Sequence, residues 1–154
     1  MPSTIWSSLS KQQLGRYAEY YAKMEFTSYG FDVYTAEVDD HGVDFVARSV
    51  KSGVFYEVQV KAVRGYQYTF VQKDKMTNGS ESLPLNRLIC FLRFEDGHLP
   101  EVYVIPATAW KNPNQVLQSK DYIGKKSKPE WGINISPKTI HLLDGFRFED
   151  TIIP

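Results

Sequence analysis

The stretch FYEVQVKA, residues 55–62, decides how this sequence is interpreted. Its residues suit an extended strand, in which successive side chains point to opposite faces of a sheet. One face is then apolar and suited to a core: Tyr56, Val58, Val60 and Ala62. After Phe55, the other face carries an acid, an amide and a base: Glu57, Gln59 and Lys61. This polar face is either an ordinary solvated surface or a set of groups directed at one substrate.

The composition limits the classes of protein to be considered. The 154 residues have the length of a single domain, residues 1–154, with enough chain to bury a core. The 18 basic residues equal the 18 acidic ones, so any nucleic-acid binding must come from local patches. Because Cys90 is the one cysteine, an intramolecular disulfide and a multi-cysteine zinc site are excluded. The apolar residues around Cys90 in the sequence predict that its side chain is buried. No signal peptide or membrane-spanning run is evident, which favours a cytoplasmic protein without a membrane partner.

The order of predicted elements favours a sheet protein with flanking helices. A helix is predicted over 8–30, with Ser10 as its N-cap and Gln13 completing a capping box. Polar segments are expected at 39–42, a turn, and at 72–86, a loop. Short helices are expected near 107–119 and 137–143. Strands are predicted at 31–38, 43–50, 54–63, 66–71, 87–94 and 100–107. This order indicates an α/β or α+β domain.

The hairpin between the strands at 43–50 and 54–63 brings a second acid to the polar face. If its loop has an even number of residues, Asp44 lies opposite Gln59 or Lys61 and shares their face. An odd loop would place Asp44 on the opposite face. A carboxylate with a carbonyl from the next strand suits Mg²⁺, which prefers oxygen ligands. A nearby lysine can position or activate the attacking water and offset charge on a phosphate.

The first helix offers a further acid for the same site. Gly15 and Ala22 lie one turn on either side of Glu19, and such small residues let a helix approach a sheet closely. These residues, in the segments LGRYAEYYAKMEFTSYGFDV, DDHGVDFVA and FYEVQVKA, resemble the PD-(D/E)XK, or restriction-endonuclease-like, nuclease superfamily. That family has a helix glutamate, then a strand aspartate, then an acid-x-lysine on the following strand. The resemblance covers roughly the first 70 residues. The segment YVIPATAW adds a weaker similarity to uncharacterised relatives of this family.

The resemblance implies a fold, a site and a cofactor. It implies a central mixed sheet flanked by helices, with Glu19, Asp44, Gln59 and Lys61 as catalytic positions. Asp44 and Glu19 would bind Mg²⁺ or Mn²⁺, and Lys61 would be the motif lysine. Gln59 takes the second acidic position, as in the glutamine-x-lysine form of Mrr-like nucleases and related uncharacterised families. A neutral amide binds Mg²⁺ less strongly than a carboxylate, so Glu57 is a secondary candidate.

Ordinary structural roles remain open for the same residues. Asp44 and Lys61 can form a cross-strand ion pair on a solvated hairpin, a pair worth up to about 1 kcal/mol. Glu19 can pair with Arg16 or Lys23 on the helix surface. His41 is interpreted as part of the polar turn. No serine or cysteine nucleophile scheme is supported.

Two further groups have alternative interpretations. Tyr66, Tyr68 and Phe70 alternate on one face and can stack on bases, although such a pattern is more typical of a core face. The basic stretch of Lys120, Lys125, Lys126 and Lys128 can bind phosphates or form a solvated loop.

The expected activity is metal-dependent hydrolysis of phosphodiester bonds in DNA, an endonuclease reaction. The alternative is a nuclease-fold module of weak or no activity that binds nucleic acid or a protein. The small size favours specificity supplied by a homodimer or by another chain.

Overall fold

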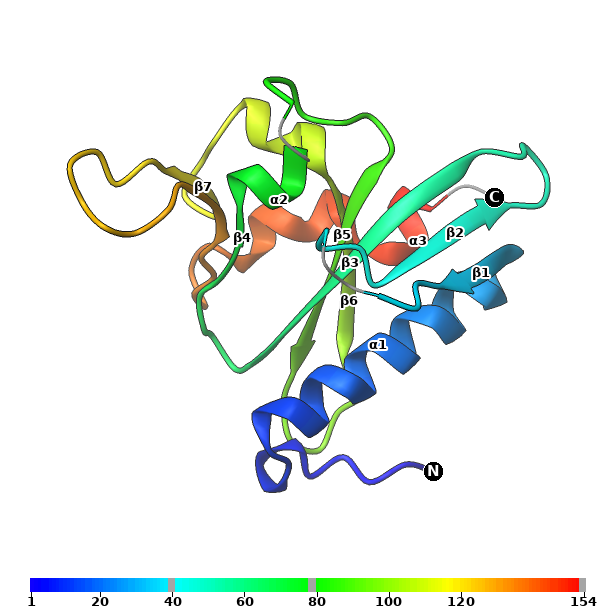
Figure 1. The fold of residues 1–154 in the computed structure, drawn as a ribbon. Coiled ribbons are helices and arrows are strands. Elements are labelled where there is room, and N and C mark those ends of the chain that lie inside the picture. The colour runs from blue at the N-terminus through cyan, green and yellow to red at the C-terminus, as the bar shows by residue number, and fades with distance from the viewer. Residues whose placement is uncertain (39–40, 78–79, 153–154) are drawn as a thin grey trace.

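The computed structural model describes residues 1–38, 41–77 and 80–152. Its largest sheet has five strands in the order β1-β2-β3-β5-β6 (Figure 1). These strands are β1 (Phe31–Thr35), β2 (Phe45–Ser49), β3 (Phe55–Arg64), β5 (Arg87–Phe94) and β6 (Glu101–Pro106). A second sheet has the order β4-β8-β7 and consists of β4 (Thr69–Gln72), β7 (Leu117–Lys120) and β8 (Glu130–Ile133).

The five-stranded sheet is mixed. β3 and β5 run parallel, with Glu57 opposite Arg87, and the other neighbouring strands are antiparallel. A parallel pair needs a crossover connection, which β4 and the short helix α2 (Lys73–Thr77) provide here. β5 is buried along its whole length because both faces of the sheet are covered. The predicted mixed sheet with flanking helices is therefore present.

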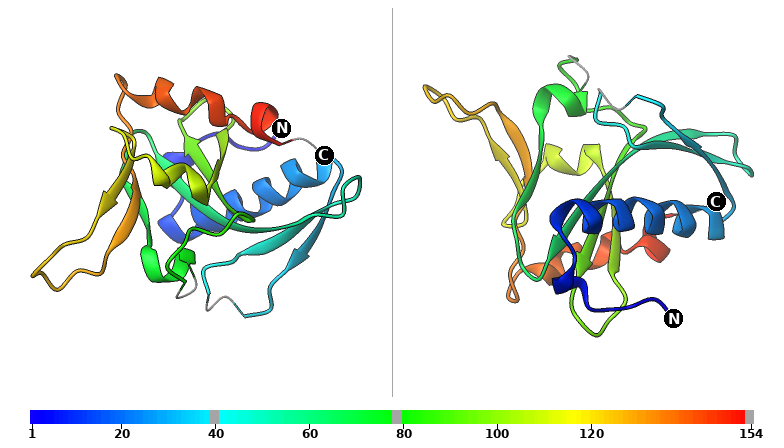
Figure 2. Two further views of the ribbon diagram at one scale, coloured as in Figure 1. Left: turned by 90° about the horizontal axis from the view of Figure 1, so that it is seen from above. Right: turned by 60° about the horizontal axis from the view of Figure 1, so that its bottom comes forward.

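The two faces of this sheet carry separate cores. On one face, helix α1 (Lys11–Ser28) and helix α3 (Phe148–Thr151) pack on a cluster that includes Phe26, Phe45 and Val58. On the other, the second sheet and two 3-10 helices, η2 (Ala107–Lys111) and η3 (Ile140–Phe146), enclose a cluster that includes Val63 and Phe91. Figure 2 shows α1 lying along the large sheet and the second sheet extending to one side of it. β3 contributes to both cores.

Helix α1 begins as its sequence predicts. The Ser10 hydroxyl accepts a hydrogen bond from the Gln13 amide at 3.1 Å, and the Gln13 side chain accepts from the Ser10 amide at 2.9 Å. This capping box satisfies two backbone donors that the helix leaves without partners. A 3-10 turn, η1 (Trp6–Ser8), precedes the helix.

Three predicted segments differ from the structure. The polar loop at 72–86 contains helix α2, and its residues 78–79 lie outside the described residues. The helix expected near 107–119 is only the short η2 followed by β7, since Leu117–Lys120 pairs with β8. The helix expected near 137–143 is the 3-10 segment η3, which begins at Ile140. The predicted turn at 39–42 also falls partly on residues 39–40, outside the described part of the chain.

Candidate active site

Asp44 lies where β2 begins, against the edge of β3. The loop between Ser49 and Val54 holds four residues, an even number, and Phe45 pairs with Val58. Asp44 consequently lies alongside Gln59. Its backbone amide donates to the Val58 carbonyl at 2.9 Å, and its carboxylate oxygen Oδ2 accepts from the Val60 amide at 2.6 Å. Both bonds are made to β3: the first fixes the Asp44 backbone and the second orients its carboxylate.

Gln59 presents a buried acceptor for which the described part of the chain supplies no donor. Its Oε1 atom is buried and accepts no hydrogen bond from any residue within 1–38, 41–77 and 80–152. The amide packs against Gly42, where an added Cβ would lie 3.3 Å from Oε1; Gly42 also has a φ of +71°, which favours glycine. Buried polar atoms are nearly always hydrogen-bonded, so an unpaired acceptor beside a carboxylate is an unusual feature.

Two grooves meet at Lys61. The larger, called here the α1 groove, has a volume of about 550 Å³ and lies between the start of α1, the second half of β3 and the segment leading into β4. The smaller, the β4 groove, has a volume of about 150 Å³ and is lined by Gln59, Lys61, Phe70, Val71, Gln72 and Lys75. Gly15 lines the α1 groove, and no atom would lie within 4 Å of a Cβ added there. Lys61 and Phe70 line both grooves.

The described lining of the two grooves is basic although the chain as a whole is neutral. Four cations lie there, namely Lys11, Lys61, Arg64 and Lys75, and no described acidic residue lines either groove. Arg64 has a second role, because its guanidinium donates to the carbonyls of Trp6, Ser7 and Leu9 and so ties the N-terminal turn to β3. Such a local concentration of positive charge attracts anions.

Glu57 has a structural partner that the sequence pattern did not reveal. Its Oε2 atom accepts from Nη2 of Arg87 at 3.0 Å and from Nε at 3.2 Å. Arg87 is only 2% exposed, and it also donates to the Lys75 carbonyl. A buried guanidinium needs a counter-charge. Glu57 neutralises Arg87, and this pairing competes with its predicted secondary role as a metal ligand.

Glu19 is engaged on the surface of its helix. Its two carboxylate oxygens pair with Arg16 at 3.3 Å and with Lys23 at 2.9 Å. This is the alternative that the helix spacing predicted. The Lys23 ammonium lies 5.9 Å from the centre of the Phe45 ring, which places the Glu19–Lys23 pair near the start of β2.

The aromatic set at residues 66, 68 and 70 lies partly at the surface. Tyr66 and Phe70 are 44% and 42% exposed, so the interpretation of this aromatic set as a core face is wrong. β4 belongs to the small second sheet, which leaves one of its faces open.

Lys125, Lys126 and Lys128 are exposed on the loop between β7 and β8, which projects from the body of the molecule (Figures 1 and 2). Lys128 lies 3.6 Å from Asp74.

Cys90 is buried as predicted and is not a nucleophile. Burial raises the pKa of its thiol well above the ordinary value, with smaller contributions from Glu25 and Asp44. Because the thiolate is the reactive form, a buried thiol of raised pKa is inert.

The residues around Asp44 fit a divalent cation in part. The Asp44 carboxylate and the unpaired Gln59 carbonyl oxygen are hard oxygen ligands, as Mg²⁺ and Mn²⁺ require. Within residues 1–38, 41–77 and 80–152, however, no group of three or more His, Cys, Asp or Glu side chains is placed to hold a metal ion. A metal here would therefore keep several waters or take ligands from the substrate.

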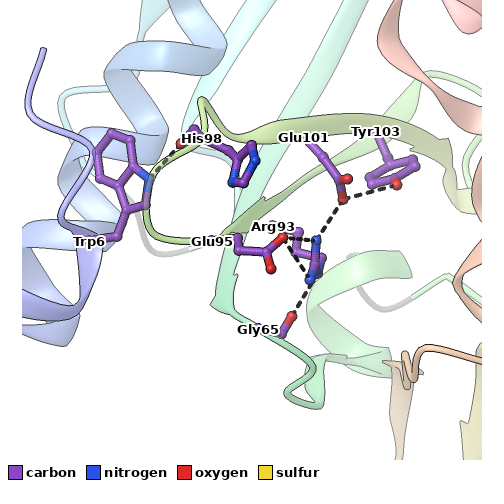
Figure 3. A network of polar contacts seen from close by, with 7 residues as sticks. All are labelled: Trp6, Gly65, Arg93, Glu95, His98, Glu101 and Tyr103. Atoms are coloured by element: carbon purple, nitrogen blue, oxygen red, sulfur yellow. Dashed lines mark hydrogen bonds and ion pairs between the residues drawn. The ribbon is translucent and has the colours of Figure 1, made fainter.

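A second polar cluster lies at the other end of β5. The Arg93 guanidinium, 4% exposed, donates to the Gly65 carbonyl at 3.0 Å and to Glu101 at 3.1 Å (Figure 3). Glu95 lies 3.4 Å away, and the Tyr66 ring covers the guanidinium at 4.2 Å. Burial by itself lowers the pKa of Arg93, but the hydrogen bond and charge of Glu101, together with Tyr66 and Glu95, outweigh it, so the pKa of Arg93 is raised.

Comparison with known structures identifies the fold. A bacterial homing endonuclease is 18% identical, the match covers 90% of this chain and 89% of that chain, and the TM-score is 0.54. Hjc, a Holliday junction resolvase from the archaeal hyperthermophile Archaeoglobus fulgidus, is 13% identical over 78% of this chain and 83% of that chain, with a TM-score of 0.49. No family model matches the chain, and a search of curated proteins gave no match. The chain therefore has the fold of a nuclease, the homing endonuclease.

No helix within the described residues is both long and apolar enough to cross a membrane.

Proposed function

We propose that this chain is a divalent-metal-dependent nuclease that hydrolyses phosphodiester bonds in DNA at Asp44, Gln59 and Lys61. The observation that carries the proposal is the Gln59 acceptor, which lies in register with Asp44, is buried, and has no donor among the described residues. A buried acceptor without a partner costs about 1–3 kcal/mol, so its presence suggests a ligand that completes it. The basic lining of the adjoining grooves supports an anionic substrate. The shared fold with a homing endonuclease agrees with this function.

Each residue has a separate role in the proposal. Asp44, oriented by the Val60 amide, and Gln59 supply oxygen ligands to the metal. A divalent ion held by these residues would supply Lewis-acid stabilisation of the phosphate and would activate water for attack. Lys61 offsets the negative charge that develops on the phosphate during hydrolysis. Lys11 and Lys75 hold the neighbouring phosphates of the strand through charge attraction.

Two observations favour the alternative of a nuclease-fold module that binds DNA without cleaving it. Both Glu19 oxygens are engaged by cations, and the second acidic position holds an amide. In this alternative the basic grooves bind the backbone and no hydrolysis follows.

A cleavage assay separates the two functions. Wild type, Asp44→Asn and the matched control Asp32→Asn are incubated with Mg²⁺ or Mn²⁺ and labelled duplex, gapped, branched and single-stranded DNA, together with RNA. Asparagine preserves the acceptor for the Val60 amide, so the fold is retained, and Asp32 is an exposed residue of β1. We expect metal-dependent cleavage that falls by about 10²–10³-fold in Asp44→Asn and is unchanged in Asp32→Asn.

Lys61→Ala adds a second test of the same site. It is expected to slow cleavage while leaving the metal bound, because lysine is not a ligand in the proposed arrangement. If wild type binds DNA but cleaves no substrate with either metal, the binding module replaces the nuclease. Equal activity of wild type and Asp44→Asn would remove Asp44 from the proposed chemistry.

A further inference from the structure

Phe70 occupies an unusual position for a large apolar side chain. It lies in β4, is 42% exposed, and lines both the α1 groove and the β4 groove. Isolated exposed apolar residues are common on protein surfaces. Phe70, however, lies where two basic grooves meet, and it shares both of them with Lys61.

The Phe70 ring is held in place from one side. It stacks on Tyr68 with the ring centres 6.1 Å apart and the planes inclined by 24°. Tyr68 is itself fixed: its hydroxyl donates to the buried Glu130 carboxylate, and the Lys120 ammonium lies 4.2 Å from its ring centre. Burial and the hydrogen bond to Glu130 also raise the pKa of Tyr68, so the phenol keeps its proton.

Gly132 contributes to the same support. Phe70 pairs with Gly132 across β4 and β8, and a Cβ at residue 132 would collide with the Tyr68 ring. The close approach therefore requires glycine. Tyr68 and Gly132 together form a rigid base for Phe70, so little conformational freedom is lost when another ring stacks on it.

The grooves on either side of Phe70 carry the charges that a nucleic-acid strand requires. Lys11, Lys61 and Arg64 line the α1 groove, and Lys61 and Lys75 line the β4 groove. Alternation of aromatic rings with cations is the pattern of single-strand binding sites, in which bases stack while phosphates meet lysine or arginine. A paired base inside a duplex has both faces already stacked, so it cannot also stack on a protein ring without leaving the helix.

We propose that Phe70 is a stacking platform for an unpaired base, so that the preferred substrate is DNA with unpaired nucleotides next to the bond at Lys61. This inference rests on the proposed nuclease site and specifies its substrate class. The unpaired base stacks on Phe70, and the phosphates on its two sides lie against Lys61 and Lys75.

The experiment measures binding without cleavage. Fluorescence anisotropy in EDTA compares a labelled hairpin duplex that carries a bulge of unpaired thymines with the same duplex fully paired. The proteins are wild type, Phe70→Leu, Phe70→Trp and the control Phe55→Leu. Leucine keeps apolar bulk but removes the π face, and Phe55 is an aromatic of similar exposure, 52%, at the opposite end of β3.

The expected result is selective. Phe70→Leu should weaken binding of the bulged DNA by about tenfold and change binding of the paired duplex by less than about twofold, because one stacked base is lost. The salt dependence of binding should stay as in wild type, since no cation is removed. Phe70→Trp should retain the preference, and Phe55→Leu should resemble wild type.

Two results would overturn the inference: equal loss of both DNAs in Phe70→Leu, or no loss of either. Cleavage of the bulged DNA with Mg²⁺ then separates this inference from the proposed function. Selective loss of binding in Phe70→Leu without any cleavage by wild type supports the platform and rejects the nuclease. Cleavage by wild type that Phe70→Leu leaves unchanged supports the nuclease and rejects the platform.

Discussion

The two ends of the β3–β5 pair differ in how fully their buried polar groups are hydrogen-bonded. At one end the Arg93 guanidinium is buried, and its contacts extend to a carbonyl, two carboxylates and an aromatic ring. Towards the other, Gln59 buries an acceptor that meets no donor among the described residues, beside an oriented carboxylate and at the edge of the β4 groove. Both ends hold several charged groups, but within the described residues only the Gln59 end leaves a buried acceptor without a donor. Incomplete hydrogen bonding, rather than the number of charged groups, is what distinguishes the candidate site from a structural cluster.

The largest effect on stability is expected at the Arg93 end. Arg93→Met removes the hydrogen bonds to Gly65 and Glu101 and should lower the free energy of unfolding by about 1–3 kcal/mol. DNA cleavage at permissive temperature should be unchanged, because no groove at the candidate site includes Arg93. Urea unfolding measures the free energy.

The matched control for Arg93→Met is Arg48→Met. Arg48 is half-buried, with its guanidinium 5.6 Å from the centre of the exposed Phe55 ring. Its replacement should change the free energy of unfolding by no more than about 0.5 kcal/mol. A loss of DNA cleavage in a folded Arg93→Met variant would mean that the Arg93 cluster also affects the candidate active site.

Gln59→Met should affect activity rather than stability, the opposite of what is expected for Arg93→Met. Methionine has a similar length and removes the unpaired acceptor, so the free energy of unfolding should stay constant or rise by up to about 1 kcal/mol. Metal-dependent cleavage should decrease, because an oxygen ligand is lost. Gln67→Met, at an exposed residue of the α1 groove, is the control for a change from glutamine to methionine. Destabilisation by Gln59→Met together with full activity would assign Gln59 to the core.

The sequence was informative where one element's own pattern decides its structure. The alternation in 55–62 predicted β3, and Ser10 with Gln13 predicted the start of α1. The sequence predicted that Asp44 shares a face with Gln59 and Lys61 only on condition of an even hairpin loop, and the four-residue loop meets that condition, because strand register propagates from the turn.

Features that depend on distant pairing were not predictable in this way. Arg87 lies opposite Glu57 only because β3 and β5 are parallel neighbours, separated in sequence by β4 and α2. Phe70 is exposed because β4 belongs to the small second sheet, whereas period-two alternation alone is equally compatible with a core face. Neither fact is encoded in the local pattern of the strands.

The smallest effect is a pH dependence in the loop between β5 and β6. The Ser7 hydroxyl donates to Asp96 at 2.5 Å and the Ser7 amide at 2.9 Å, and this hydrogen bonding lowers the pKa of the Asp96 carboxyl. An acid with a lowered pKa stabilises the fold above its ordinary pKa, and this stabilisation is lost as the pH falls through the lowered value.

Asp96→Asn should therefore lower the Tm at neutral pH, and the difference from wild type should shrink as the pH falls below the ordinary carboxyl pKa of about 4 and through the lowered value. Scanning calorimetry over this pH range measures the difference. A difference in Tm that stays constant with pH would show that the Asp96 charge is not involved.

The central claim is that Asp44 and Gln59 hold a divalent cation in the presence of DNA. Its most direct test is a calorimetric titration with Mg²⁺ and then Mn²⁺, in which the protein is bound to a bulged hairpin whose target linkage is a non-cleavable methylenephosphonate that keeps both non-bridging oxygens. The account predicts binding by wild type and by Lys61→Ala, and loss of binding in Asp44→Asn. Equal binding by wild type and Asp44→Asn, or no binding by wild type even with DNA present, would contradict it.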